Sequence, residues 1–352
     1  MVAQRPRLNA RDFMAHGEPL GYPPLRAAIA GYINRTRAVR CKAGQVVVTS
    51  GTQQSLDLVA RLLLDRGDEF WMEDPGYAPV TSLLRSHGAK VIGVPVDAQG
   101  LDCDAGRRRC RLARLAYVTP HCQFPLGIPM SHERRLKLLQ WANEAGAWIF
   151  EDDYDGDLPF ENTPVAALHS LDRASCVIYS SSFNRLLFPS LRLGFMILPA
   201  AFVEPAAAAI SISQRYYPVM EQATLAHFIL EGHWDMHIRR MRELYQERRE
   251  ALVGAARSEL GGLMRLSDSQ AGSQVIGWLA PGMSEAEAYR RAAANGIDSI
   301  ALSRLTIERR MPPGLVLGIG GADIRAIRTG IKHLGRVLRA LAWQQGIRAT
   351  SA

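Results

Sequence analysis

Short apolar segments alternate with amphipathic segments over the first two thirds of the chain, and this alternation restricts the fold more than any other feature. The apolar segments are rich in β-branched residues and are followed by turn residues; they lie at 45–49, 69–73, 90–95, 115–119, 147–152, 176–180 and 192–198. Stretches 24–34, 53–64 and 132–145 carry the apolar period of a helix. Strands that alternate with helices form a parallel sheet. The pattern therefore predicts an α/β fold with a large domain built on a mainly parallel, seven-stranded sheet.

The last third of the chain has a different pattern. A strongly charged helix is predicted at about 237–258, and it resembles a connector between domains. After it come one predicted strand, at 275–279, and two predicted helices, at 284–295 and 322–341. This predicts a large domain at 1–235, a connecting helix at 236–259 and a smaller α+β domain at 260–352.

Composition excludes several classes of protein. The net charge is +8, but the basic residues are interleaved with acids, which is typical of a solvated surface and not of a nucleic-acid-binding face. The most apolar stretch, 56–64, contains Asp57 and Arg61 and is too short to cross a bilayer, and the N-terminus lacks the apolar region of a signal peptide. We therefore expect no membrane association and a cytoplasmic location. The five cysteines form an odd set without a CxxC pair, which predicts free thiols and no metal site.

Small residues after the first strand form the first candidate ligand site. Gly51, Thr52 and Gln53 stand between strand 45–49 and the next helix, where free backbone N–H groups and the helix dipole stabilise a phosphate. The alternative is an ordinary turn and helix cap. Ser182 and Arg192, near the last two strands, are further phosphate ligands by chemistry, and the apolar surroundings of Arg192 predict a buried, paired guanidinium.

Three other strand ends carry candidate residues. Tyr77 follows strand 69–73 and is placed to stack on a planar ligand, although a surface turn at Pro75-Gly76 explains the segment equally well. Asp152 ends an apolar strand, so its carboxylate needs a cation or strong donor, and a protonated pyridine nitrogen is such a partner. Tyr154 lies two residues further on. The irregular loop 119–127 is a ligand-contacting loop or a purely structural one.

Taken together, these segments resemble the aminotransferase domain of fold-type I pyridoxal-phosphate enzymes, and most closely that of the MocR/GabR-type regulators of the GntR family. The resemblance covers about 17–341 and rests on the order and spacing of several fragments: GEPLGYPPLRAAIAGY, VTSGTQQSLDL, EDPGY, TPHCQFPLG, EDDYDGD, FPSLRLGF and FILEGHWDMHIRRMRELYQERR.

The resemblance implies a role for each candidate residue. Gly51, Thr52, Gln53, Ser182 and Arg192 would bind the phosphate of pyridoxal 5′-phosphate. The resemblance implies ring contacts for three further residues. Tyr77 would stack on the pyridine ring, Asp152 would pair with its nitrogen, and Tyr154 would bond its phenolic oxygen. It also implies a homodimer with an amino acid or amine as its small-molecule partner. The chain begins beyond the family's winged-helix domain, so we expect no DNA binding by this chain alone.

The chain departs from the family pattern where catalysis would be expected. Arg185 stands at the position of the lysine that forms the Schiff base with the cofactor. A guanidinium stays protonated and neither attacks an aldehyde nor shuttles a proton. None of the four lysines lies in an equivalent loop. Ordinary transamination is therefore expected to fail, and any pyridoxal phosphate is expected to bind non-covalently.

Two more departures concern the same region. Cys122 replaces the usual histidine of the loop 119–127, and we interpret it as a small buried thiol. Val316 stands where many relatives place an arginine that binds a substrate carboxylate. Three hypotheses remain open: an aminotransferase-type enzyme with impaired turnover, a non-catalytic domain that binds pyridoxal phosphate or its amino-acid adduct as an effector, and a decayed gene fragment.

Overall fold

The fold was analysed in a computed structural model that describes residues 17–158, 166–268 and 272–347. A large sheet occupies the first part of the chain, in the order β1-β8-β7-β6-β5-β2-β3-β4. Its strands are β1 (Val46–Thr49), β2 (Glu69–Asp74), β3 (Lys90–Asp97), β4 (Gly100–Leu101), β5 (Leu115–Val118), β6 (Trp148–Asp152), β7 (Val177–Ser182) and β8 (Gly194–Ile197).

The sheet confirms the predicted α/β class and corrects the strand count from seven to eight. Strands β3, β2, β5, β6 and β7 are parallel neighbours, whereas β8 runs antiparallel to both β1 and β7. The additional strand, β4, has only two residues and pairs antiparallel with the end of β3. Such a short strand carries no alternation of its own, which is why the sequence pattern did not predict it.

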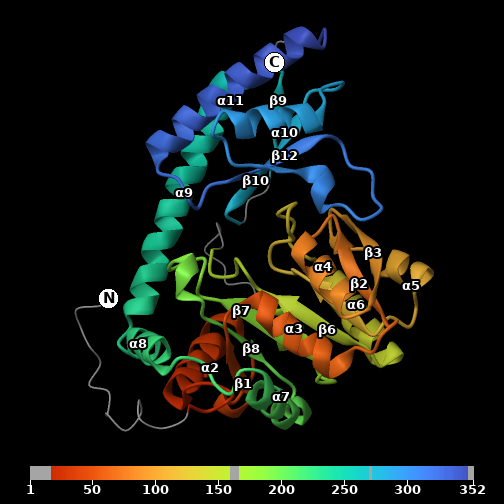
Figure 1. Ribbon diagram of the computed structural model, residues 1–352, viewed down its shortest axis with the longest axis vertical. Coiled ribbons are helices and arrows are strands. Elements are labelled where there is room, and N and C mark those ends of the chain that lie inside the picture. Colours follow the sequence, from red (N-terminus) through yellow and green to blue (C-terminus); the bar gives the residue numbers. More distant parts are fainter. Residues whose placement is uncertain (1–16, 159–165, 269–271, 348–352) are drawn as a thin grey trace.

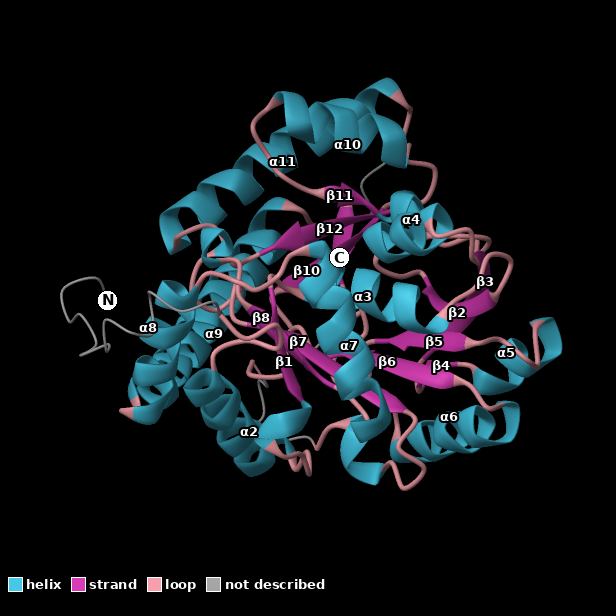
Figure 2. Ribbon diagram, turned by 60° about the horizontal axis from the view of Figure 1, so that its bottom comes forward, coloured by secondary structure: helices cyan, strands magenta, loops and turns pink. Residues whose placement is uncertain are grey.

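Helices cover both faces of this sheet (Figure 2). They are α2 (Pro23–Arg37), α3 (Thr52–Leu63), α4 (Ala78–Ser86), α5 (Cys103–Arg109), α6 (His132–Ala145), α7 (Ala200–Ser213) and α8 (Val219–Leu230), with 3-10 turns η1 (Ala43–Gln45), η2 (Leu168–Leu171) and η3 (Pro189–Leu191). Helix α6 shows how local sequence sets the bounds, because the Ser131 side chain accepts from the Arg134 N–H and the left-handed Gly146 ends it. Among the described residues, no helix is both long and apolar enough to cross a membrane.

A second, antiparallel sheet of four strands lies in the C-terminal third, in the order β11-β12-β10-β9 (Figure 1). Its strands are β9 (Met264–Leu266), β10 (Gln274–Leu279), β11 (Ile300–Ala301) and β12 (Gly314–Gly318), accompanied by η4 (Leu302–Leu305). The helices of this region are the long α9 (His233–Glu259), α10 (Glu285–Ala294) and α11 (Ile324–Gln344). Helix α9 leads from the large sheet to the small one and packs along α11 (Figure 1). The domain limits at 235 and 259 stay a prediction.

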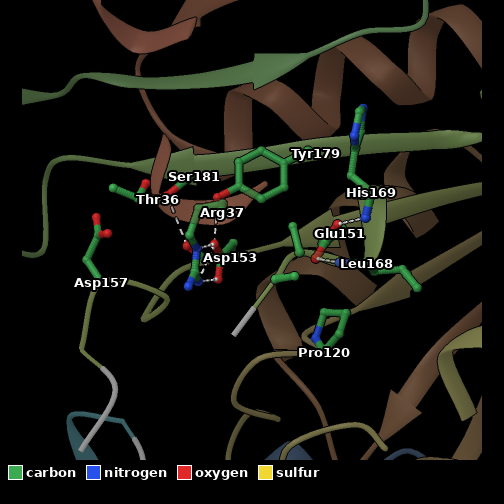
Figure 3. Close-up of polar contacts among 12 residues, drawn as sticks. Thr36, Arg37, Pro120, Glu151, Asp153, Asp157, Leu168, His169, Tyr179 and Ser181 are labelled. Carbon is green, nitrogen blue, oxygen red and sulfur yellow. Dashed lines mark hydrogen bonds and ion pairs between the residues drawn. The ribbon is translucent and has the colours of Figure 1, made fainter. Parts of the chain in front are cut away.

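A buried ion pair joins α2 to the end of the large sheet (Figure 3). The Arg37 guanidinium donates to both carboxylate oxygens of Asp153 at 2.6–2.8 Å, and both side chains are less than 5% exposed. The Tyr179 hydroxyl, from β7, donates to the same carboxylate at 2.5 Å. Although burial alone would raise the pKa of Asp153, the Arg37 charge and these hydrogen bonds hold it below its usual value. The network stabilises the ionised pair next to β6.

We expect Tyr179→Phe to lower the free energy of unfolding by about 1.5–3 kcal/mol, because it removes one hydrogen bond to a buried charged carboxylate. Urea denaturation followed by circular dichroism measures this quantity. Tyr289→Phe is the matched control, since the Tyr289 hydroxyl only accepts from the exposed Arg304, and we expect a change below about 0.5 kcal/mol. Equal effects of the two substitutions would contradict a stabilising role for Tyr179.

Candidate functional site

A cavity of about 410 Å³ opens at the carboxyl ends of the parallel strands. The eight residues predicted to bind the cofactor and Arg185 all line it, and the roles implied for them stay predictions. The full lining is Gly51, Thr52, Gln53, Tyr77, Tyr117, Thr119, Phe124, Asp152, Tyr154, Ser182, Asn184, Arg185, Pro189 and Arg192. This is the edge at which open α/β sheets bind ligands, because loops from several strands converge there.

One wall of the cavity is the N-terminus of α3. No side chain caps this helix end, so its first backbone N–H groups face the cavity region without an intrahelical acceptor. Gly51 has a φ of 128°, and a side-chain carbon on Gly194 would lie 2.7 Å from the Gly51 Cα, so both positions require glycine. The buried Gln53 Nε2 makes no hydrogen bond to a described residue. Burial raises the pKa of the nearby Tyr77 phenol.

Arg192 differs from the expectation. It was expected to be buried and paired, but it is exposed, adopts a left-handed backbone conformation with φ of 53°, and among the described residues its guanidinium donates to the Ser50 Oγ alone, at 3.4 Å. Of the apolar residues on either side in the sequence, Leu193 is buried and Leu191 is partly buried, whereas the left-handed turn before β8 points the arginine toward solvent at the cavity rim. Ser182, the last residue of β7, lies deeper and accepts from the Asn184 N–H.

Asp152 ends β6 in a buried position. Its two oxygens accept from the Tyr117 hydroxyl at 2.6 Å and from the Thr52 hydroxyl at 3.2 Å, and it forms no ion pair with any residue in the described ranges. Burial raises the pKa of the Asp152 carboxyl to about 7, and the two hydroxyl donors only partly oppose this rise. A cation placed against Asp152 would therefore be strongly favoured.

Three aromatic side chains form another wall. The Phe124 ring makes edge-to-face contacts with Tyr77 and Tyr154, at centroid distances of 5.5 and 6.2 Å. The Tyr154 hydroxyl accepts from Gln274 Nε2 at 3.1 Å and donates to the Cys122 Sγ at 3.6 Å. Cys122 is buried, as expected, and burial raises the pKa of its thiol to about 12, so it is no nucleophile at neutral pH.

Arg185 is held in an ion pair between the two sheets. Its Nε lies 3.0 Å from Asp155 Oδ1, and its Nη2 donates to the Ser273 hydroxyl next to β10. The Asp155 side chain is fully buried and accepts from the Ser273 N–H at 3.0 Å. The Arg185 guanidinium also lies 5.1 Å from the centre of the Tyr154 ring. Although burial alone would lower it, Asp155 raises the pKa of Arg185, which therefore keeps its charge.

No lysine belongs to the lining. Lys42 precedes η1, Lys90 begins β3, and Lys137 and Lys332 lie in α6 and α11, as predicted. Every described residue that lines the cavity lacks an amine that could attack an aldehyde. The position at which the family resemblance implies that amine is Arg185, a guanidinium whose orientation is set by Asp155.

Comparison with known proteins identifies the family. The family model for aminotransferase class I and II matches residues 2–288. This chain belongs to that family. It is 38% identical over 341 residues to the probable rhizopine catabolism regulatory protein MocR of Rhizobium meliloti, a match that covers 97% of this chain and 69% of that protein. It is 35% identical to the uncharacterized HTH-type transcriptional regulator YhdI of Bacillus subtilis strain 168, over 92% of this chain and 68% of that protein.

Solved structures agree with this assignment. The α-aminoadipate aminotransferase of Thermus thermophilus, in complex with N-(5′-phosphopyridoxyl)-L-leucine, is 27% identical with a TM-score of 0.85 and covers 94% of this chain and 85% of that chain. The kynurenine aminotransferase of Pyrococcus horikoshii, at 24% identity and a TM-score of 0.86, has the same fold. Membership of this family implies pyridoxal phosphate as the cofactor of the fold.

Five lining residues were not singled out in the sequence: Tyr117, Thr119, Phe124, Asn184 and Pro189. Tyr117 lies near the end of β5 and Thr119 directly follows that strand, and the position of a strand end at the ligand edge was the available signal for them. Phe124 belongs to loop 119–127, which was considered as a ligand-contacting loop. Val316, in β12, does not line the cavity and is buried in an apolar cluster with Ile276 and Leu302.

Proposed function

We propose that this aminotransferase-family chain binds pyridoxal phosphate or a phosphopyridoxyl compound non-covalently and does not catalyse ordinary transamination. The observation that carries the proposal is the Arg185–Asp155 ion pair, at 3.0 Å, in the place of the lysine. A paired guanidinium neither forms a covalent bond with the cofactor nor moves a proton. The chain would then act as a binding or effector domain of the kind found in MocR-type regulators.

Three features of the cavity fit such a ligand. The uncapped N-terminus of α3 and the Gln53 Nε2, which has no hydrogen-bond partner among the described residues, suit a phosphate, with Ser182 and Arg192 beside them. The buried Asp152 carboxylate forms no ion pair with a described residue, and a protonated pyridine nitrogen would supply the missing cation. When bound, the pyridinium ring acts as an electron sink. Tyr77 and Phe124 would enclose the ring, and Tyr154 would lie beside its phenolic oxygen.

The direct test is isothermal titration calorimetry of the purified chain with pyridoxal phosphate and with N-(5′-phosphopyridoxyl)-L-leucine, the compound bound by the Thermus relative. We expect saturable binding of at least one of them. Borohydride treatment in the presence of pyridoxal phosphate, followed by mass spectrometry, should leave the protein mass unchanged. Binding of neither compound would refute the proposal, and a reduced adduct on one of the four lysines would refute its non-covalent part.

A second candidate function is aminotransferase activity that persists at a low rate. It is favoured by the Asp152 site, which is equipped to keep a pyridine nitrogen protonated. The substrate would be an amino acid or amine. Half-transamination followed by absorbance in a single turnover distinguishes this candidate from pure binding, because only turnover converts the bound cofactor.

We also propose that the chain acts as a homodimer and that its large part ends near residue 235. Large apolar side chains are exposed on or next to α7 and α8, among them Ile212, Met220 and Leu230, and a second copy would cover them. Sedimentation equilibrium measures the assembly. A chain that is only monomeric or aggregated would favour the decayed-fragment hypothesis.

A further inference from the structure

The guanidinium of Arg185 is only partly used by its protein contacts. A guanidinium carries five N–H groups, one on Nε and two on each terminal nitrogen. Asp155 engages Nε, and Ser273 and Gln274 accept from Nη2. Nη1 makes no hydrogen bond to a residue of the described ranges, and the side chain is 36% exposed toward the cavity that it lines. One edge of an oriented cation is therefore available to a ligand.

We propose that Arg185 binds the carboxylate of an amino acid that is joined to the phosphopyridoxyl group, so that the ligand of this site is a phosphopyridoxyl amino acid. This inference rests on the proposed function, because it needs a phosphopyridoxyl ligand in the cavity. It assigns a binding role to the residue that replaces the lysine.

The placement of the ligand groups leads to Arg185. A phosphate at the start of α3 and a pyridine nitrogen at Asp152 occupy one side of the cavity, where the Thr52 hydroxyl links the two. The carbon that carries the amino group lies across the ring from the nitrogen, so it points away from Asp152. The remaining wall contains Arg185, Tyr154 and Phe124. An amino acid attached there carries its carboxylate one carbon from the amine, within the reach of a guanidinium.

The other positions for a carboxylate are less suitable. Arg185 and Arg192 are the two basic residues in the described lining, and Arg192 is exposed near the proposed phosphate site. Val316, where the family resemblance implies that many relatives place a carboxylate-binding arginine, is surrounded by the apolar residues Ile276 and Leu302. Arg185 is also oriented in advance by Asp155 and Ser273, which reduces the entropy lost when a carboxylate binds.

The experiment compares two ligands that differ only in the carboxylate: N-(5′-phosphopyridoxyl)-L-leucine and N-(5′-phosphopyridoxyl)-3-methylbutylamine. For the unaltered chain, calorimetry should give a Kd about 10- to 100-fold lower for the leucine compound, as a charge-assisted hydrogen bond predicts. In Arg185→Met this ratio should fall to about 1, while the Kd of the amine compound changes less than about threefold.

A second variant protects the test against a folding defect. Arg185→Gln retains an N–H for Asp155 and should show the same collapse of the ratio, and thermal melts report whether each variant is folded. A ratio that stays above about tenfold in a folded variant overturns the inference. So does an unaltered chain that binds both ligands equally, a result that leaves the proposed function intact. Binding of neither ligand by the unaltered chain refutes the proposed function itself.

Discussion

Arg185→Lys is expected to acquire a covalent bond to pyridoxal phosphate that the unaltered chain lacks. The substitution supplies an amine at the cavity position where the family resemblance implies the Schiff-base lysine, while the α3 N-terminus, Asp152 and Tyr77 stay in place. After borohydride reduction, mass spectrometry should show one phosphopyridoxyl group per chain in the variant and none in the unaltered chain. Half-transamination of an added amino acid should become faster by at least about 100-fold, the scale of a positioned acid–base group.

The new lysine should react best at alkaline pH. Asp155 lies 3.0 Å from the present guanidinium and would stabilise a protonated amine, which raises its pKa and lowers the reactive fraction. Adding Asp155→Asn to the variant should therefore shift covalent modification toward neutral pH.

Arg192→Lys is the matched control, because it places a lysine at the rim of the same cavity, and we expect no stoichiometric adduct from it. If Arg185→Lys binds pyridoxal phosphate but forms no adduct even at pH 9, the missing lysine is not the only defect of the site.

Asp152→Asn is expected to weaken pyridoxal phosphate binding by about 100-fold, because it removes the buried charge that would pair with the pyridine nitrogen.

The same change should stabilise the ligand-free chain above neutral pH. Burial raises the pKa of Asp152 to about 7 in the folded state, above the value of about 3.9 in an unfolded chain. The folded state thus binds the Asp152 proton more tightly than the unfolded state does. The free energy of unfolding of the unaltered chain therefore falls as the pH rises from about 4 to 7.

Asparagine does not titrate, so the stability gained by the variant over the unaltered chain grows between about pH 4 and pH 7 and is constant above that range. Thermal melts of the ligand-free proteins at pH 5 and pH 8 should show a larger gain in Tm for the variant at pH 8. With saturating pyridoxal phosphate, the unaltered chain should instead have the higher Tm. The exposed Asp65→Asn serves as the control and should change neither affinity nor the pH dependence of Tm. An equal Tm difference at both pH values would show that Asp152 is not buried as a carboxylate.

Local pattern was sufficient for most of the fold. The β2 strand and helix α6 begin where the apolar periods predict, and α6 also ends there, because a buried strand or helix face needs apolar residues at a fixed spacing. The apolar pattern placed a strand at 192–198, which contains β8, but it does not encode strand direction and so did not predict that β8 runs antiparallel. It also did not predict β4, because two residues are too few to carry a period. The second sheet, with its order β11-β12-β10-β9, likewise depends on pairings between distant segments.

The candidate site divides in the same way. The residues at strand ends, such as Gly51, Tyr77 and Asp152, were predictable because the carboxyl ends of parallel strands meet at one edge, and the absence of a lysine at position 185 is a fact of sequence alone. Only the tertiary structure decided which groups the arginine at this position contacts. The Arg185–Asp155–Ser273 contacts join residues up to 118 positions apart, and a turn of left-handed backbone exposes Arg192. Where a guanidinium points depends on which buried carboxylate the fold brings to it, and no local pattern carries that information.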